Sequence, residues 1–158
     1  MTIVVDVSAD GARTPLASVR VKRVATAVLR AEGVRDALVS IAFVSAREIG
    51  RLNKRHLAHS GATDVISFAL GAGKERSAVH PVVGDIYIAP EVARANAIRF
   101  GRRVREELAR LVIHGTLHVL GHDHPDGTDR TISPMWRRQE RLLSSASVRR
   151  ALFGAREP

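Results

Sequence analysis

The alternation of apolar and polar positions predicts a chain in which strands and helices are mixed. Short runs rich in β-branched and aromatic residues predict four strands, at residues 3–7, 38–44, 63–68 and 82–89. The second run is almost wholly apolar, so we expect that strand to be buried on both faces. A polar loop at 71–80, and no helix, separates the last two strands, so we expect them to pair antiparallel.

Apolar residues at helical spacing predict helices between and after these strands. The predicted helices begin near Thr14, Ser45, Pro90, Arg102 and Ser133. Four of these starts carry a capping residue or an N-terminal proline. The fourth helix is predicted to reach about residue 120, and the tail from about residue 144 is expected to be frayed, disordered or weakly docked.

This order of elements is typical of an α+β fold, in which about five helices pack on one mixed sheet. A chain of 158 residues is large enough for one core, so we expect a single domain over residues 1–158. Its first residues lack a basic start, and no stretch approaches the roughly 18 apolar residues of a membrane span. We therefore expect a cytoplasmic protein with no membrane partner.

The charge balance indicates a class of partner. The formal net charge is +9, and only three of the 25 basic residues are Lys. A coding bias toward Arg would explain Arg over Lys, but not the excess of basic over acidic residues. That excess favours a polyanionic partner such as a nucleic acid. The chain has no Cys, so any metal site must use His and carboxylates.

Three histidines near the end of the fourth predicted helix have the spacing of a metal site. His114 and His118 are four residues apart, so a helix places both imidazoles on one face. Gly121 can take the left-handed conformation that ends a helix, and His124 can then approach the same point. Three neutral imidazoles suit a tetrahedral Zn²⁺ with an open fourth position, which is typical of catalytic zinc. We expect one zinc ion per chain.

Two further residues of this motif bear on its chemistry. Zinc peptidases with this spacing carry Glu, as general base, directly after the first His, whereas this chain has Gly115. The pattern therefore predicts a zincin-like metal helix without the peptidase base. His122 could ligate in place of His124, but the three-ligand spacing favours His124. We otherwise expect His122 to line the site, with proton transfer as a candidate role.

Three other stretches accompany the histidine motif in a fixed order. They are Leu52-Asn53, the run TDVISF at 63–68 and the run GDIYIAPEVA at 84–93. Together with residues 114–124 they resemble the YbeY family of bacterial metal-dependent endoribonucleases, over about residues 41–143. The resemblance implies a mixed four-stranded sheet with surrounding helices, and a zinc ion on His114, His118 and His124.

The resemblance also implies a function and its partners. It implies cleavage of single-stranded RNA, in the 3′-end maturation of small-subunit ribosomal RNA and in ribosome quality control. The implied partners are ribosomal RNA and the ribosomal small subunit, and no DNA substrate is expected. Many members carry Arg at the position of Leu57. In this chain Arg55 or His56, close by, could take over the role of that Arg. They usually carry an aromatic residue at the position of His122, which could still stack on a base.

The catalytic step can rely largely on the metal. Zinc lowers the pKa of bound water from about 16 toward 7, and RNA carries its own 2′-hydroxyl nucleophile. A phosphodiester therefore demands less of a protein base than an amide does. We identify no general base and expect metal-bound water to act. Asp123 is a candidate, although a role in a turn or in orienting a ligand fits it better.

Two groups of Arg are candidate RNA-binding surfaces, one before the metal helix and one on the last helix. Glu106 and Glu107 lie beside the first group, so a solvated face explains it equally well. We expect Trp136 to be a core residue, and Asp64 and Asp85 to be turn or cap residues. The two groups are Arg94, Arg99, Arg102, Arg103 and Arg105, and Arg137, Arg138 and Arg141.

A second function remains open from the sequence. The protein could be a ribosome assembly or RNA-binding factor whose zinc is mainly structural, and the absence of Arg at Leu57 favours this slightly. This alternative predicts RNA affinity without cleavage, and unfolding when the metal is removed. Gly115 makes a third class, the metallopeptidases, the least favoured.

Overall fold

The computed structural model describes residues 2–9, 12–57, 63–71, 80–125 and 127–154. Its strands are β1 (Ile3–Ser8), β2 (Ala37–Phe43), β3 (Val65–Ala69) and β4 (Val82–Ile88). They form a sheet in the order β1-β2-β4-β3, in which only the β3–β4 pair is antiparallel. The predicted mixed sheet and its antiparallel pair are therefore confirmed. Most of the predicted polar loop, at 72–79, lies outside the described residues.

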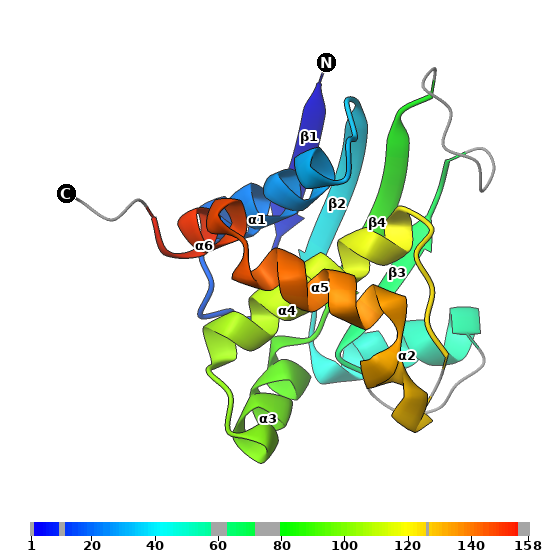
Figure 1. The fold of residues 1–158 in the computed structure, drawn as a ribbon. Helices are drawn as coiled ribbons and strands as arrows, with labels where there is room; N and C mark the ends of the chain where they lie inside the picture. Colours follow the sequence, from blue (N-terminus) through cyan, green and yellow to red (C-terminus); the bar gives the residue numbers. More distant parts are fainter. Residues whose placement is uncertain (1, 10–11, 58–62, 72–79, 126, 155–158) are drawn as a thin grey trace.

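Six α-helices and a short 3-10 helix accompany the sheet in the described part of the chain, where about five helices were predicted. Figure 1 shows α1, α4, α5 and α6 in front of one face of the sheet, with α5 crossing over α4. None of these helices is long and apolar enough to cross a membrane. The helices are α1 (Ser18–Ala31), α2 (Ala46–Leu57), α3 (Pro90–Phe100), α4 (Val104–Val119), η1 (Gly127–Ile132), α5 (Pro134–Ser144) and α6 (Ala146–Phe153).

Side-chain caps fix two of the predicted helix starts. The Ser45 hydroxyl accepts a hydrogen bond from the backbone N–H of Glu48, at 3.1 Å, at the start of α2. Ser133 caps α5 in the same way. Thr14 does not cap α1, because its hydroxyl accepts from the N–H of Leu16 and forms a turn ahead of the helix.

Strand β2 has one buried face, which corrects the prediction of two. Val39 and Ile41 are fully buried, whereas Leu38, on the opposite face, is 53% exposed. On that opposite face α2 covers only the β3 side of the sheet, through Ile49 and Ile66. An apolar run shows that a strand is suited to burial, but it does not show whether a second layer of helices covers it.

Helix α4 lies unusually close to the sheet, because two glycines leave room for it. A Cβ on Gly84 of β4 would lie 2.4 Å from a methyl carbon of Val119, and a Cβ on Gly115 would lie 2.7 Å from Cγ2 of Ile86. Real Cβ atoms essentially never make contacts this short. The two glycines thus fix the depth and rotation of the helix that carries His114 and His118.

The C-terminal tail is ordered as far as Gly154, which corrects the expectation of a frayed or disordered tail from about residue 144. Ser145 caps helix α6, whose Val148, Ala151 and Leu152 are buried at helical spacing. The Arg20 guanidinium on α1 donates to the carbonyl oxygen of Leu152, at 3.0 Å. Eight residues give too weak a periodic signal for prediction, and the packing against α1 supplies the stability that the short helix lacks.

Candidate metal centre

The Nε2 atoms of three histidines converge on one point. Nε2 of His124 lies 3.2 Å from Nε2 of His118 and 3.3 Å from Nε2 of His114. His114 and His118 project from α4, and His124 follows the end of that helix. The structure therefore brings together the three residues that the spacing predicted, as a group that could hold a metal ion.

The turn that delivers His124 is a glycine-dependent helix end. Gly121 has φ 93°, in the left-handed region. Its N–H donates to the carbonyl of His118, and the N–H of His122 donates to the carbonyl of Leu117. These two bonds form a Schellman motif, which turns the chain at Gly121, three residues after the second histidine.

The other ring nitrogen of each histidine donates to an oxygen that can only accept. Nδ1 of His114 lies 2.7 Å from Oε1 of Gln139. Nδ1 of His118 lies 3.0 Å from the carbonyl oxygen of His122, and Nδ1 of His124 lies 2.9 Å from that of Pro125. In a neutral imidazole this places the proton on Nδ1 and leaves the Nε2 lone pair free.

This arrangement fits a zinc ion. Three unprotonated Nε2 atoms in contact repel one another unless a cation lies between them. Tetrahedral zinc, with nitrogen ligands at about 2.0–2.1 Å, places those nitrogens about 3.3–3.4 Å apart. The observed Nε2–Nε2 separations of 3.2 and 3.3 Å are close to that value.

Burial keeps the first two rings neutral. His114 is 4% exposed, and its burial, reinforced by the neighbouring His118, lowers its pKa to about 3. Burial, with the proximity of His124, also lowers the pKa of His118. Both imidazoles are thus neutral at neutral pH, with the proton on Nδ1 and Nε2 unprotonated, which is the form that binds a metal.

Gln139 is a functional residue that the sequence did not reveal. It lies on α5, 1% exposed, and holds the ring of His114 from a position 25 residues further along the chain. Its spacing from Met135 and Leu143 places a polar residue on the buried face of α5, which is the one sequence signal that could have identified it.

Replacing Gln139 with Leu should weaken metal binding by about 10–100-fold, because His114 loses the acceptor that fixes its tautomer and orientation. Competition with a coloured chelator measures the affinity. Gln139→Glu keeps an acceptor and should retain tight binding, and Arg137→Leu, exposed on the same helix, is the control. Equal affinity of the Leu variant and the wild type would show that this hydrogen bond does not support the ligand.

Position 115 has no room for the peptidase base. Gly115 faces the sheet, where an added Cβ would also lie 3.1 Å from the hydroxyl oxygen of Ser67. A Glu side chain there would start inside the packing between α4 and the sheet. The structure therefore supports the argument against peptide hydrolysis made from the sequence.

The remaining predicted site residues have different surroundings. Nε2 of His122 lies 3.0 Å from Oε2 of Glu32, and Asp123 accepts from the N–H of His124 at 2.8 Å, as a turn-forming residue does. Arg55 is exposed in the last turn of α2. The side chain of Leu57 lies outside the described residues. The roles of these residues in binding or catalysis stay predictions.

Glu32 connects the turn that carries His122 to helices α1 and α5. It follows the last residue of α1, and its side chain is only 8% exposed. Its carboxylate accepts from Nε of Arg138 on α5 at 2.6 Å and also faces His122. Burial raises the pKa of the Glu32 carboxyl, but the hydrogen bonds with Arg138 and His122 outweigh it and lower the pKa overall. This ion-paired carboxylate anchors the segment whose backbone holds His118.

A hollow of about 530 Å³ opens beside His114 and Gln139. Asp64 in its wall receives a hydrogen bond from the Asn96 amide, and burial raises the pKa of this carboxyl despite the opposing charge of Arg130. Nε of Arg130 is buried without a hydrogen-bond partner among the described residues. Asp64 and Arg130 come from segments far apart in the sequence, and neither was predicted to face the site.

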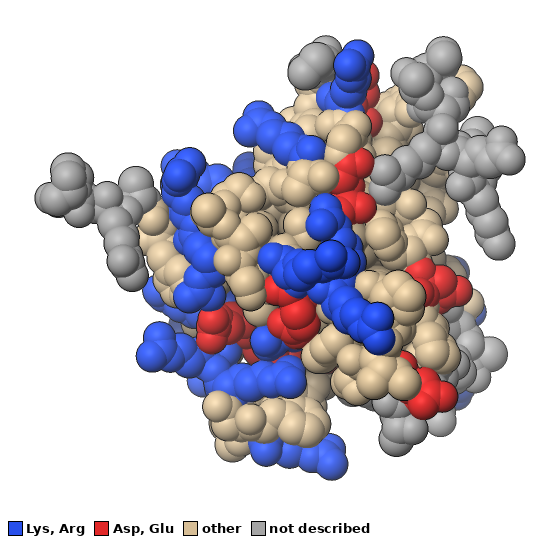
Figure 2. All heavy atoms as spheres, in the orientation of Figure 1, with Lys and Arg blue, Asp and Glu red and all other residues tan. Residues whose placement is uncertain are grey.

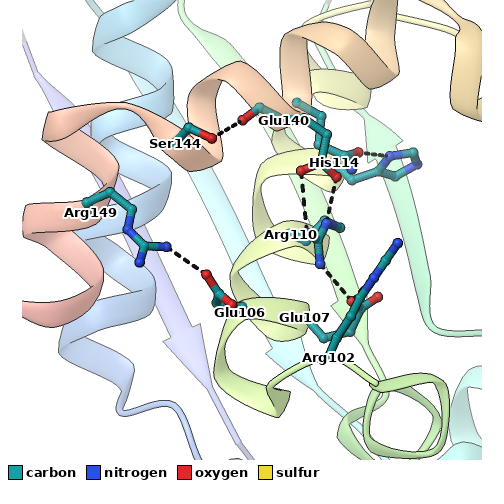
Figure 3. Close-up of polar contacts among 9 residues, drawn as sticks. Arg102, Glu106, Glu107, Arg110, His114, Glu140, Ser144 and Arg149 are labelled. Carbon is teal, nitrogen blue, oxygen red and sulfur yellow. Dashed lines mark hydrogen bonds and ion pairs between the residues drawn. The ribbon is translucent and has the colours of Figure 1, made fainter. Parts of the chain in front are cut away.

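An ion-pair network, shown in Figure 3, includes three residues that line this hollow, Arg102, Glu107 and Arg110. Arg110 on α4 binds Glu140 of α5 at 2.7 Å and Glu107 at 2.9 Å, and Arg102 reaches Glu107 at 3.4 Å. The two carboxylates surround the half-buried Arg110 and compensate its charge. The network holds α5, and therefore Gln139, against α4, the helix that carries His114 and His118.

Fold and site together define a class of protein, an α+β protein that can hold a metal ion on three histidines with no carboxylate next to the first. A family model described as Endoribonuclease YbeY matches residues 10–147. The chain belongs to the endoribonuclease YbeY family, and by family it is an endoribonuclease, as the resemblance implied.

Individual relatives agree with this assignment. The endoribonuclease YbeY of Bacillus licheniformis is 33% identical over 159 residues, covering 96% of this chain and 99% of the relative. The Bacillus subtilis protein of the same name is 37% identical over 127 residues, covering 76% and 80%. A solution structure of a Thermotoga maritima protein has a TM-score of 0.59 at 23% identity, covering 96% of this chain and 90% of that one, which supports the fold.

Proposed function

We propose that the chain acts as one domain that binds a single zinc ion on His114, His118 and His124 and cleaves single-stranded RNA beside it. The observation that carries this proposal is the convergence of three Nε2 atoms on rings whose Nδ1–H groups all donate hydrogen bonds to oxygen acceptors. When bound, zinc would polarise a phosphoryl oxygen and lower the pKa of a coordinated water. Family membership supports RNA as the substrate.

The protein's own residues would hold and orient the reacting phosphodiester. Arg130, whose Nε has no hydrogen-bond partner within the described part of the chain, and Arg102 line the hollow next to His114, where a phosphate would find cationic donors. The carboxyl of Asp123 is committed to the turn through the N–H of His124, so its candidate role as a base would require this bond to be shared. The net charge of +9 supports attraction of a polyanion.

We further propose that the substrate is the 3′ end of small-subunit ribosomal RNA, and that the protein serves rRNA maturation and ribosome quality control in the cytoplasm. The resemblance over residues 41–143 supports these assignments, with the small subunit as partner. Zinc held by the three histidines would act on an accessible phosphodiester, which a single-stranded 3′ extension provides.

The decisive experiment offers the zinc-loaded protein a 3′-extended small-subunit rRNA in three forms: as a free single strand, annealed to a complementary strand, and within purified small subunits. Cleavage of the free and subunit-bound extensions, with the annealed form intact, is the expected result. Binding of the RNA without cleavage in any form would replace this proposal with an RNA-binding assembly factor. Equal cleavage of the annealed RNA would contradict the single-strand requirement.

A further inference from the structure

Two hollows on the α5 side of the molecule share one wall, Trp136. The first is the hollow beside His114, and the second, of about 830 Å³, is an open groove along α5. Trp136 is only half-buried and lines both, whereas the sequence predicted a core residue. The described residues thus form a continuous surface from the metal centre, past one indole ring, to the exposed side of α5.

The groove along α5 is lined by two Arg side chains that form no ion pair within the described residues. Arg137 and Arg141 are one helical turn apart, both line the groove, and both are exposed. Neither guanidinium has an ion-pair or hydrogen-bond partner among the described residues. By contrast, Arg110 and Arg138, on the inner side, are paired with carboxylates. Figure 2 shows Lys and Arg side chains over this face, with fewer acidic side chains between them.

The position of Trp136 is fixed by the start of α5. Its backbone N–H donates to the hydroxyl of the N-cap Ser133 at 3.2 Å, and its neighbour Met135 is buried in the core. The backbone that carries the indole is therefore rigid while the ring keeps an accessible side. A fixed, half-exposed aromatic ring between cationic hollows has the chemistry of a base-stacking platform for single-stranded nucleic acid.

We propose that Trp136 stacks on an unpaired base of the RNA substrate, and that Arg137 and Arg141 bind the phosphates beyond it. The strand then runs from the metal centre past Trp136 and along the outer side of α5. This inference rests on the proposed function, since it takes the scissile phosphate to lie beside His114. Stacking requires an unpaired base, so the platform also favours single strands over duplexes.

Trp136 is the one Trp of the chain, so its fluorescence reports this contact directly. Mixing the zinc-loaded protein with a short oligoadenylate should quench the emission in a saturable manner, measured in a stopped-flow instrument before cleavage proceeds. The same strand annealed to its complement, inorganic phosphate and a polyglutamate peptide should leave the emission unchanged. No quenching by the single strand, or equal quenching by the peptide, would overturn the proposal.

Substitution tests the contribution to substrate binding. Trp136→Leu should raise KM for a single-stranded RNA about tenfold with little change in kcat, which corresponds to about 1.4 kcal/mol. Trp136→Phe keeps an aromatic face and should recover most of the loss in KM. If Trp136 only filled space, recovery would depend on side-chain volume and not on the presence of an aromatic ring. Ile132→Ala, at a residue 63% exposed that lines neither hollow, is the matched control and should keep the wild-type KM.

The two phosphate contacts have their own signature. The double variant Arg137→Gln and Arg141→Gln should bind RNA more weakly and with a shallower dependence on salt, by about two units of logarithmic slope at most. An unchanged slope would overturn this part of the proposal. Cleavage with an unchanged KM in Trp136→Leu would overturn the platform alone, whereas quenching without cleavage would keep the platform and overturn the nuclease.

Discussion

RNA cleavage by the His118→Ala variant should fall by about 10³-fold or more, equivalent to about 4 kcal/mol of lost transition-state stabilisation. His118 is the middle of the three converging ligands, and its removal leaves two imidazoles that cannot enclose a tetrahedral ion. Steady-state cleavage of a labelled single-stranded RNA measures the loss, with bound zinc determined on the same samples.

The control for this experiment is His80→Ala, prepared alongside. His80 is an exposed histidine outside the three-ligand group, so its replacement should leave both zinc content and cleavage at the wild-type level. A strong chelator should lower the activity of the wild type and of His80→Ala to that of His118→Ala. If His118→Ala cleaved as fast as the wild type, the three histidines would not be the catalytic metal site.

Gly115→Glu should unfold the protein or destabilise it by roughly 4 kcal/mol or more, without creating a peptidase. The new side chain would enter the contact between α4 and the sheet, where even a Cβ lies 2.7 Å from Ile86, and it would bring a charge into the core. Urea unfolding of the zinc-loaded protein measures the change. Gly115→Ala should cost less, because the better helix propensity of Ala offsets about 1 kcal/mol of the overpacking.

Ala95→Ser is the matched control for Gly115→Ala. Both substitutions add one heavy atom to a helix, but Ala95 lies at an exposed position of α3. Its stability should stay within about 0.5 kcal/mol of the wild type. A Gly115→Glu protein as stable as the wild type would show that α4 moves away from the sheet easily. Proteolysis of an unfolded substrate by this variant would show that position 115 has room for a working peptidase base. Both results would contradict the close packing described for α4.

The close contact of α4 with the sheet explains how a pattern of separate motifs forms one site. Gly84 lies in the GDIYIA run and Gly115 in the histidine motif, and each accommodates a side chain of the other element. Both runs belong to the family resemblance, but their physical role becomes evident only where β4 and α4 touch. The glycine that replaces the peptidase base is thus also the residue that allows the metal helix to pack.

The sequence by itself determined the features that depend on short stretches. The convergence of three histidines that could hold a metal ion was predictable because a single helix, its Gly121 end and the following turn carry all of them within 11 residues. The strands, most helix starts and the antiparallel β3–β4 pair were predictable for the same reason, since caps, periodicity and short connections are local signals. The family resemblance rested on these same local runs.

Only the tertiary structure decided the features that join distant segments. Gln139 reaches His114 from another helix, Glu32 reaches His122 across 90 residues, and Trp136 lines two hollows instead of the core. The single buried face of β2 and the docking of α6 likewise depend on which elements cover which surfaces. No local pattern encodes these contacts, because each depends on side chains from separate elements meeting after the core has packed.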